Sequence, residues 1–167
     1  LDVLKRLGVV RARKPVLTGK RRKTLYEIAD YYFDFWFRFV YEFEEDIDSG
    51  FPEGALAEFE RGFPTYMGRA FERMAEELVR EGIFCPFCPE KVGKEWDGVE
   101  VNVVALSKEE AFLAEVKWGS VAESEAERIL RGLREKAELL PLKGRKPRFG
   151  LIARRIEAKE SLRREGY

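Results

Sequence analysis

Four polar residues have a spacing that can place them on one face of a predicted β-hairpin. Glu100 and Asn102 lie in one apolar segment, and Glu115 and Lys117 lie in the next. Because side chains alternate across a strand, residues two apart share a face. A charged pair within an apolar strand loses solvation unless its members contact each other or a ligand. The pattern therefore favours a functional site.

The chemistry that fits this set is metal-assisted hydrolysis of a phosphodiester. A hard divalent cation, Mg²⁺ or Mn²⁺, prefers oxygen ligands such as those of Glu115. Lys117 can orient or help deprotonate the attacking water and can offset charge in the transition state. The alternative is a structural ion pair between Glu115 and Lys117 at an exposed sheet edge.

Composition excludes several other kinds of site. The chain has no histidine, so Ser-His-Asp and Cys-His catalysis and histidine-containing zinc sites are ruled out. Cys85 and Cys88 form a single pair, which is too few ligands for a structural zinc ion, and we interpret them as a structural pair, reduced or disulfide-bonded. No glycine-rich phosphate loop is present, so this sequence carries no ATP site of that type.

The charge of the chain is balanced overall and uneven locally. Formal net charge is zero, and charged residues make up 37% of the chain, which is typical of surfaces with ion-pair networks at high temperature and predicts a thermophilic source. No apolar run is long enough to cross a bilayer, so we expect a cytoplasmic protein that does not interact with membranes. Basic residues gather near the start, at Lys5, Arg6, Arg11, Arg13, Lys14, Lys20, Arg21, Arg22 and Lys23.

The first third of the chain predicts a basic hairpin and an aromatic helix. Residues 9–16 and 23–28 read as strands around the turn at residues 18–21, which resembles the final wing of a winged helix. Its basic tip fits either contact with a DNA backbone or an ordinary solvated loop. Asp30 can cap a helix over residues 31–43, whose many aromatic residues predict burial in a core or interface.

The rest of the chain predicts an alternation of helices and strands. Proline can begin a helix at Pro52 and again at Pro64, the second running to Glu81. The remaining expected elements are strands at 82–85, 92–96, 99–106 and 111–118, a helix at 122–140, a strand at 148–153 and a helix from Ile156 to the end. Residues 64–153 thus predict an α-β-β-β-α-β core.

Several segments resemble a known family. Tyr66-Met67-Gly68, Phe71-Glu72, residues 100–105 and residues 115–118 are similar to the nuclease-like C-terminal domain of archaeal P-loop ATPases, a PD-(D/E)XK domain. Residues 26–30 and 35–40 resemble the segment that joins the winged helix to that domain. The resemblance implies an α/β fold with a restriction-endonuclease-like core. It also implies three parts, a winged-helix remnant at 1–28, aromatic linking helices at 29–63 and the nuclease-fold domain at 64–167.

The same resemblance assigns roles to individual residues. Glu72 matches the helical acid, Asn102 the central Asp, Glu115 the second acid and Lys117 the lysine. Glu115, Lys117 and Glu72 would then be catalytic, and Asn102 and Glu115 would bind Mg²⁺ or Mn²⁺. Asn102 departs from the family because an amide oxygen brings no negative charge, and Glu100 on the same face can substitute for it.

Two functions follow as expectations. The first is a metal-dependent DNA endonuclease or DNA-processing domain that belongs to an archaeal ATPase. The second is a catalytically degenerate module that binds nucleic acid or a protein partner and regulates that ATPase. The chain begins with Leu1 rather than Met, so we expect a fragment of a longer protein, with an N-terminal P-loop ATPase part as one partner and a homodimer as a further assembly.

Overall fold

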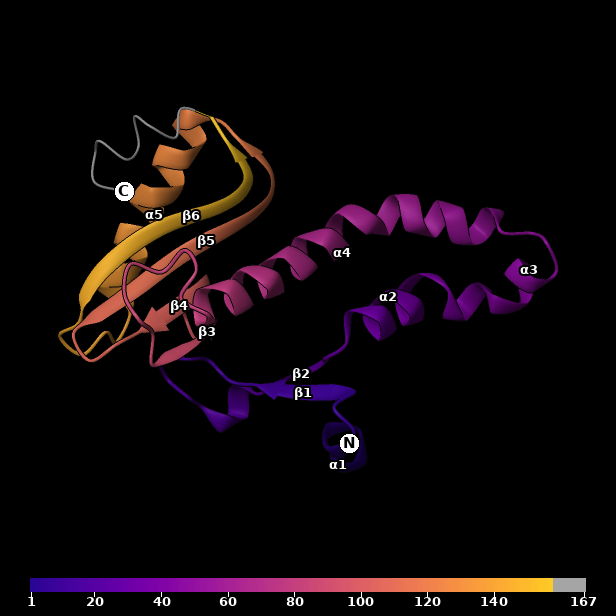
Figure 1. The fold of residues 1–167 in the computed structure, drawn as a ribbon, viewed down its shortest axis with the longest axis horizontal. Coiled ribbons are helices and arrows are strands. Elements are labelled where there is room, and N and C mark those ends of the chain that lie inside the picture. Colours follow the sequence, from indigo (N-terminus) through magenta and orange to yellow (C-terminus); the bar gives the residue numbers. More distant parts are fainter. Residues whose placement is uncertain (158–167) are drawn as a thin grey trace. The chain divides into compact units, whose positions relative to one another are not determined.

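The structure is a computed structural model that describes residues 1–157 of the 167-residue chain (Figure 1). Its residues form two compact units. The first comprises Leu1–Arg13 and Thr24–Ala70, and the second comprises Lys14–Lys23 and the chain from Phe71 onward. Each unit has its own core. Among the described residues, no helix has both the length and the apolar character needed to cross a membrane.

The first unit joins a hairpin to a group of helices. Strands β1 (Val10–Arg13) and β2 (Leu25–Ile28) pair antiparallel, with Val10 opposite Ile28. The winged-helix interpretation of this region stays a prediction. The helices of the unit are α1 (Asp2–Arg6), α2 (Tyr31–Phe39), a 3-10 turn (Tyr41–Phe43), α3 (Glu44–Asp48) and the first part of α4 (Glu53–Arg80).

Helix α4 differs from the sequence prediction of two helices. It is continuous across Pro64, which lies inside it rather than at its start. A proline within a helix removes one backbone hydrogen bond and crowds the preceding turn. Phe59, Phe63 and Tyr66 on both sides of Pro64 pack into one aromatic cluster, and this packing outweighs the local preference for a break.

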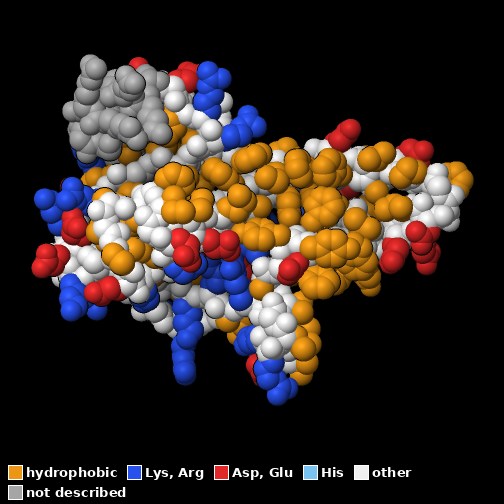
Figure 2. Space-filling view, in the orientation of Figure 1, with side chains coloured by type: hydrophobic (Ala, Val, Ile, Leu, Met, Phe, Trp, Pro, Cys, Tyr) orange, Lys and Arg blue, Asp and Glu red, His pale blue; other side chains and the backbone are white. Residues whose placement is uncertain are grey.

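The aromatic helix α2 buries one side only. Asp30 caps it as predicted, because its side chain accepts a hydrogen bond from the backbone N–H of Phe33 at 3.1 Å. Phe39 is buried against Tyr66, whose hydroxyl donates to the carbonyl oxygen of Tyr31 at 3.1 Å. The helix ends at Phe39 instead of Phe43, and within this chain one of its sides is buried. Burial of the rest in an interface stays a prediction. The other side of the helix is exposed at Tyr32, Phe33 and Phe37. Figure 2 shows hydrophobic side chains gathered on the surface of this helical part of the chain.

The second unit is built on a mixed four-stranded sheet in the order β3-β4-β5-β6. Strands β3 (Lys91–Glu95), β4 (Val101–Leu106) and β5 (Glu110–Val121) pair antiparallel. Helix α5 (Glu123–Leu139) then connects β5 to β6 (Lys146–Ile156), which pairs parallel to β5. The order of strands and helix predicted from residue 92 to residue 153 is confirmed, and the unit is a mixed α/β structure.

The sheet has a helix on each face. On one face, Leu130 and Leu133 of α5 pack with Val104 and Leu113 of the sheet. On the other face, Ala75 and Val79 of α4 pack with residues that alternate with these, among them Val103, Ala105, Ala114 and Val116. These two apolar layers fix which side chains of β5 face α5 and which face α4.

Three predicted boundaries are corrected by the structure. Residues 82–85 are not a strand, because Gly82 and Phe84 have positive φ values of 80° and 63° and form a turn after α4. Strand β4 begins at Val101, so Glu100 lies just outside it. The strand predicted at 148–153 extends over Lys146–Ile156. Most of the helix predicted from Ile156 onward lies outside the described residues.

The predicted basic turn between β1 and β2 packs against the second unit's sheet. The N–H of Val16 donates to the carbonyl of Lys94 at 3.0 Å, and the N–H of Leu17 donates to the carboxylate of Glu95 at 2.7 Å. Lys20 also pairs with Asp97 at 2.5 Å, and its hydrogen bond lowers the pKa of that carboxyl. Part of the basic tip is therefore neutralised within the fold.

Candidate functional site

Glu115 and Lys117 share the face of β5 that is turned toward α5. The Nζ atom of Lys117 lies 3.3 Å from one carboxylate oxygen of Glu115, and the Nζ atom of Lys136 lies 3.8 Å from the other. An open cavity of about 240 Å³ lies here, lined by Glu115, Lys117, Glu125, Arg128, Ile129, Gly132 and Lys136. The register predicted for these two β5 residues is confirmed.

Asn102 does not line this cavity. Its side chain is buried, and its Oδ1 accepts a hydrogen bond from the backbone N–H of Val116 at 3.1 Å. The recorded pairing of β4 with β5 ends at Val103 and Ala114. Beyond that point the side-chain oxygen of Asn102 accepts the hydrogen bond of a β5 backbone N–H, as a main-chain carbonyl would do between two paired strands. Asn102 therefore has a structural contact with β5.

Glu72 and Glu100 meet at a lysine that sequence reasoning did not identify. The Nζ atom of Lys94, on β3, lies 3.0 Å from a Glu72 oxygen and 2.7 Å from a Glu100 oxygen. Burial alone would lower the pKa of Lys94, but hydrogen bonds to the two carboxylates outweigh it and raise that pKa.

The carboxylate of Glu100 is stabilised both by Lys94 and by Lys136, a lysine that lines the cavity. The hydrogen bond from Lys94 lowers the pKa of Glu100 against a smaller opposing effect of burial. The positive charge of Lys136 lowers it further. Since Lys136 also approaches Glu115, one lysine of α5 acts on both acids.

The arrangement brings few free oxygen donors together. Among residues 1–157, no three Asp, Glu, Cys or His side chains lie close enough together to hold one. The oxygen of Asn102 is used by Val116, and the carboxylate of Glu115 is approached by two ammonium groups. The cavity lining contains Lys117, Lys136 and Arg128 against Glu115 and Glu125, which is one more cation than anion and favours an anionic ligand.

The polar contribution of α5 to the cavity was not predicted from the sequence. The prediction of this helix relied on its apolar stripe, whereas Glu125, Arg128 and Lys136 lie on the adjacent stripe with Gly132 between them. Residues three, four or seven positions apart share a helix face, so this polar stripe was visible in the sequence. The glycine in the middle of the helix was a second signal, because it lacks a side chain that could fill the cavity.

The two cysteines are free thiols. Cys88 is exposed and Cys85 is half-buried, and burial raises the pKa of the Cys85 thiol. A raised pKa keeps a thiol protonated, whereas catalytic cysteines require a lowered one. Cys85 therefore lacks the lowered pKa that a catalytic thiol requires.

Comparison with known proteins gives a family and one curated relative. The family DUF234, described as archaea bacterial proteins of unknown function, matches residues 36–129, which is more than half of the chain. An uncharacterized protein of Methanocaldococcus jannaschii is 28% identical over 148 residues, which cover 85% of this chain and 33% of that protein. The match thus spans about a third of the length of this relative. No solved structure matches the chain.

Proposed function

Since the chain belongs to the DUF234 family of archaeal and bacterial proteins of unknown function, we propose its function from the site itself. Residues 64–157 are a PD-(D/E)XK-type module that lacks a full set of metal-binding acids and binds nucleic acid through its phosphates. The order α4-β3-β4-β5-α5-β6, with β6 parallel to β5, supports this fold type. So does the position of Glu115 and Lys117 on one face of β5.

The cavity between β5 and α5 carries the proposal. Its cations Lys117, Lys136 and Arg128 come from two elements and outnumber its acids. Lysine and arginine contacts to phosphate supply the sequence-independent part of nucleic-acid affinity. Arg128 pairs with Glu125 within α5, whereas Lys117 and Lys136 approach one carboxylate from two different elements, so the two lysines are the stronger candidates for a shared phosphate contact. Lys117 and Lys136 both approach the carboxylate of Glu115, which keeps the two ammonium groups close to each other.

The longer protein that such a module serves is a further part of this proposal. The match covers only 33% of the M. jannaschii relative. We propose that a P-loop ATPase part lies in the longer protein and that this module regulates it on binding nucleic acid. The segments that resemble archaeal P-loop ATPases support this assignment.

A binding experiment with matched lysine variants tests the phosphate site. Fluorescence anisotropy with a labelled duplex, repeated over a salt series, gives affinity and its salt dependence. Lys136→Ala and Lys117→Ala should each weaken binding and reduce the salt slope by about 1 per lost phosphate contact. Lys108→Ala is the control, because Lys108 lies exposed in the β4–β5 turn. Equal binding by all four proteins would rule out this cavity as the phosphate site.

A second candidate function is a Mg²⁺- or Mn²⁺-dependent endonuclease. It is favoured by Glu115 and Lys117, which share an open face as such chemistry requires. The family resemblance would assign the metal to Asn102 and Glu115, with Glu72 in support. Because Asn102 binds the backbone of β5 and Glu72 pairs with Lys94, Glu115 would be the acid ligand on this face. Incubation with supercoiled and single-stranded DNA in Mn²⁺ tests it, with Glu115→Ala as the control. Cleavage that is lost in the variant supports the enzyme, and no cleavage by the wild-type chain leaves the binding module.

A further inference from the structure

Trp118 follows Lys117 on β5 and lies at an irregularity of the sheet. Lys117 pairs with Ala153 of β6, and the next recorded pair is Ser120 with Arg155. Two residues of β5, Trp118 and Gly119, are therefore opposite one residue of β6, Arg154. This is a β-bulge, which re-aims side chains and is frequent beside functional sites.

The indole ring of Trp118 is held in place but not covered. The ring of Phe71 meets it edge-on, with centroids 5.4 Å apart and planes at 60°. The guanidinium carbon of Arg154 lies 5.3 Å from its centroid, within the range of a cation–π contact. Even so, 38% of Trp118 is exposed. A tryptophan that only sealed the core would be expected to bury more of its ring.

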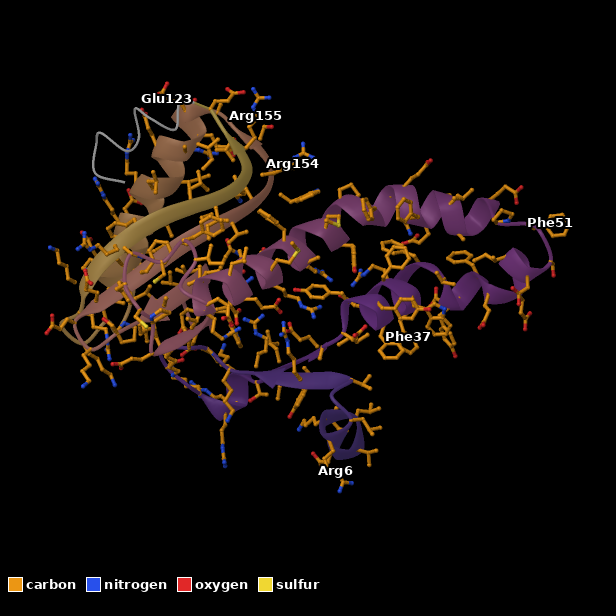
Figure 3. The ribbon with its side chains drawn as sticks, in the orientation of Figure 1. Arg6, Phe37, Phe51, Glu123, Arg154 and Arg155 are labelled. Carbon is orange, nitrogen blue, oxygen red and sulfur yellow. The ribbon has the colours of Figure 1, made fainter. Side chains whose placement is uncertain are left out.

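The surroundings of Trp118 are basic and accessible. The recorded β4–β5 pairing ends at Val103 and Ala114, while the β5–β6 pairing continues to Val121 and Ile156. Trp118 is thus in a ribbon that extends beyond β4. Arg154 and Arg155 project from this end of the ribbon (Figure 3).

Lys117, which lines the cavity, and Trp118 are consecutive residues on opposite faces of β5. Side chains alternate along a strand, so Lys117 faces the cavity on the α5 side and Trp118 faces Phe71 of α4. One residue separates a phosphate-binding cation from a partly open aromatic ring at the rim of the ribbon.

We propose that Trp118 and Arg154 form a stacking site for an unpaired base of single-stranded nucleic acid, beside a phosphate at Lys117. This inference rests on the proposed function and names its substrate class. Bases stack on aromatic rings and on arginine planes, and basic residues follow the phosphates. A protein partner would also use a tryptophan, but the neighbouring cations Lys117, Arg154 and Arg155 match a polyanion. In a duplex the bases are stacked on each other, so the site selects an unpaired strand.

The experiment compares three probes that differ in their bases. They are a labelled thymidine oligonucleotide of about 12 nucleotides, an abasic strand with the same backbone, and a duplex. The full chain should prefer the thymidine strand to the abasic strand. Trp118→Leu keeps an apolar contact for Phe71 but removes the aromatic face. It should weaken binding of the thymidine strand about tenfold and leave the other two probes within about twofold.

Two further variants separate stacking from folding. Trp118→Phe retains a ring and should keep most of the preference for bases. Phe37→Leu changes an exposed aromatic residue of the first unit and should have no effect on any probe. Thermal melting by circular dichroism shows whether each variant is folded.

The outcomes distinguish this inference from the proposed function. If Trp118→Leu weakens binding of the thymidine strand and of the abasic strand equally, or weakens binding of neither strand, then the ring does not stack on a base and the inference is wrong. Binding of nucleic acid that still depends on Lys136 would leave the proposed function standing in that case. If the wild-type chain binds none of the three probes, both are wrong.

Discussion

Changing Asn102 tests both the structural contact of this residue and the missing metal charge. Its Oδ1 accepts the N–H of Val116 at 3.1 Å in a buried position. Asn102→Ala removes that acceptor, and a buried amide without its partner costs about 1–3 kcal/mol. Asn102→Asp keeps an acceptor for Val116, so this part of the stability is retained.

The aspartate variant has an opposing cost that metal can reverse. A carboxylate at this buried position is poorly solvated, so we expect a net loss of about 1–2 kcal/mol without metal. Divalent metal that binds the folded variant at a hundredfold excess over its Kd contributes about 2.7 kcal/mol. Asn102→Asp should therefore be less stable than the wild type without Mn²⁺ and at least as stable with it.

Urea unfolding of the wild type, Asn102→Ala and Asn102→Asp with and without Mn²⁺ measures these differences. Titration calorimetry with Mn²⁺ gives the affinities directly. Equal Mn²⁺ affinity of the wild type and Asn102→Asp would refute the reasoning about the missing charge. Wild-type stability of Asn102→Ala would refute the role of the side chain in the sheet.

Three further changes test other contacts. Glu95 is fully buried and accepts hydrogen bonds from the backbone N–H groups of Leu17, Trp96 and Asp97. Glu95→Gln should therefore lower the free energy of unfolding in urea by about 2–3 kcal/mol. It should also speed trypsin cleavage of the basic turn. The pKa of Glu100 is lowered from 4.5, so its contribution is present above that value and is lost as pH falls through the lower folded pKa. The melting temperatures of the wild type and Glu100→Gln should therefore converge in acid. Phe39→Ala should cost about 3–5 kcal/mol, measured by the same unfolding, because this ring is at the centre of the first unit's aromatic cluster.

The alternating pattern of β5 could be predicted from the sequence because it is a local property. Ala114 and Val116 are apolar and must be buried, so Glu115 and Lys117 must point the other way. A shift by one residue would bury both charges, and this fixes the register without knowledge of the partner strands. The order of the surrounding elements follows in the same way from periodicity and turn residues.

The contacts of Asn102 could not be predicted because they depend on where two strands separate. Alternation along β4 places Asn102 on the face of Glu100, toward a shared site. The structure instead directs its oxygen to the backbone of β5, fourteen residues away in sequence. The path of the partner strand decides whether such a side chain faces outward or replaces a backbone hydrogen bond between the strands. The residues next to Asn102 in the sequence do not reveal that path.

The basic turn shows the same limit over a longer separation. Lys20 appeared solvated because nothing nearby in the sequence opposes its charge. Its partner is Asp97. Two residues before Asp97, the carboxylate of Glu95 accepts a hydrogen bond from the N–H of Leu17, which is 78 residues away in sequence. The interior of α4 at Pro64 is a third case, since distant aromatic contacts override a local signal for a helix start.

The acids and lysines around the sheet form ion pairs without any contribution from the neutral side chain of Asn102. Three lysines and three acids form two groups, Glu72–Lys94–Glu100, which includes an acid of α4, and Lys117–Glu115–Lys136 on the α5 side of the sheet. The cations match the acids one for one, and Lys136 lowers the pKa of Glu100 as well. With Asn102 neutral, no excess negative charge remains to attract a divalent cation, whereas one further carboxylate would create it. A further carboxylate at position 102 is therefore the single change that tests whether this region can hold a divalent cation.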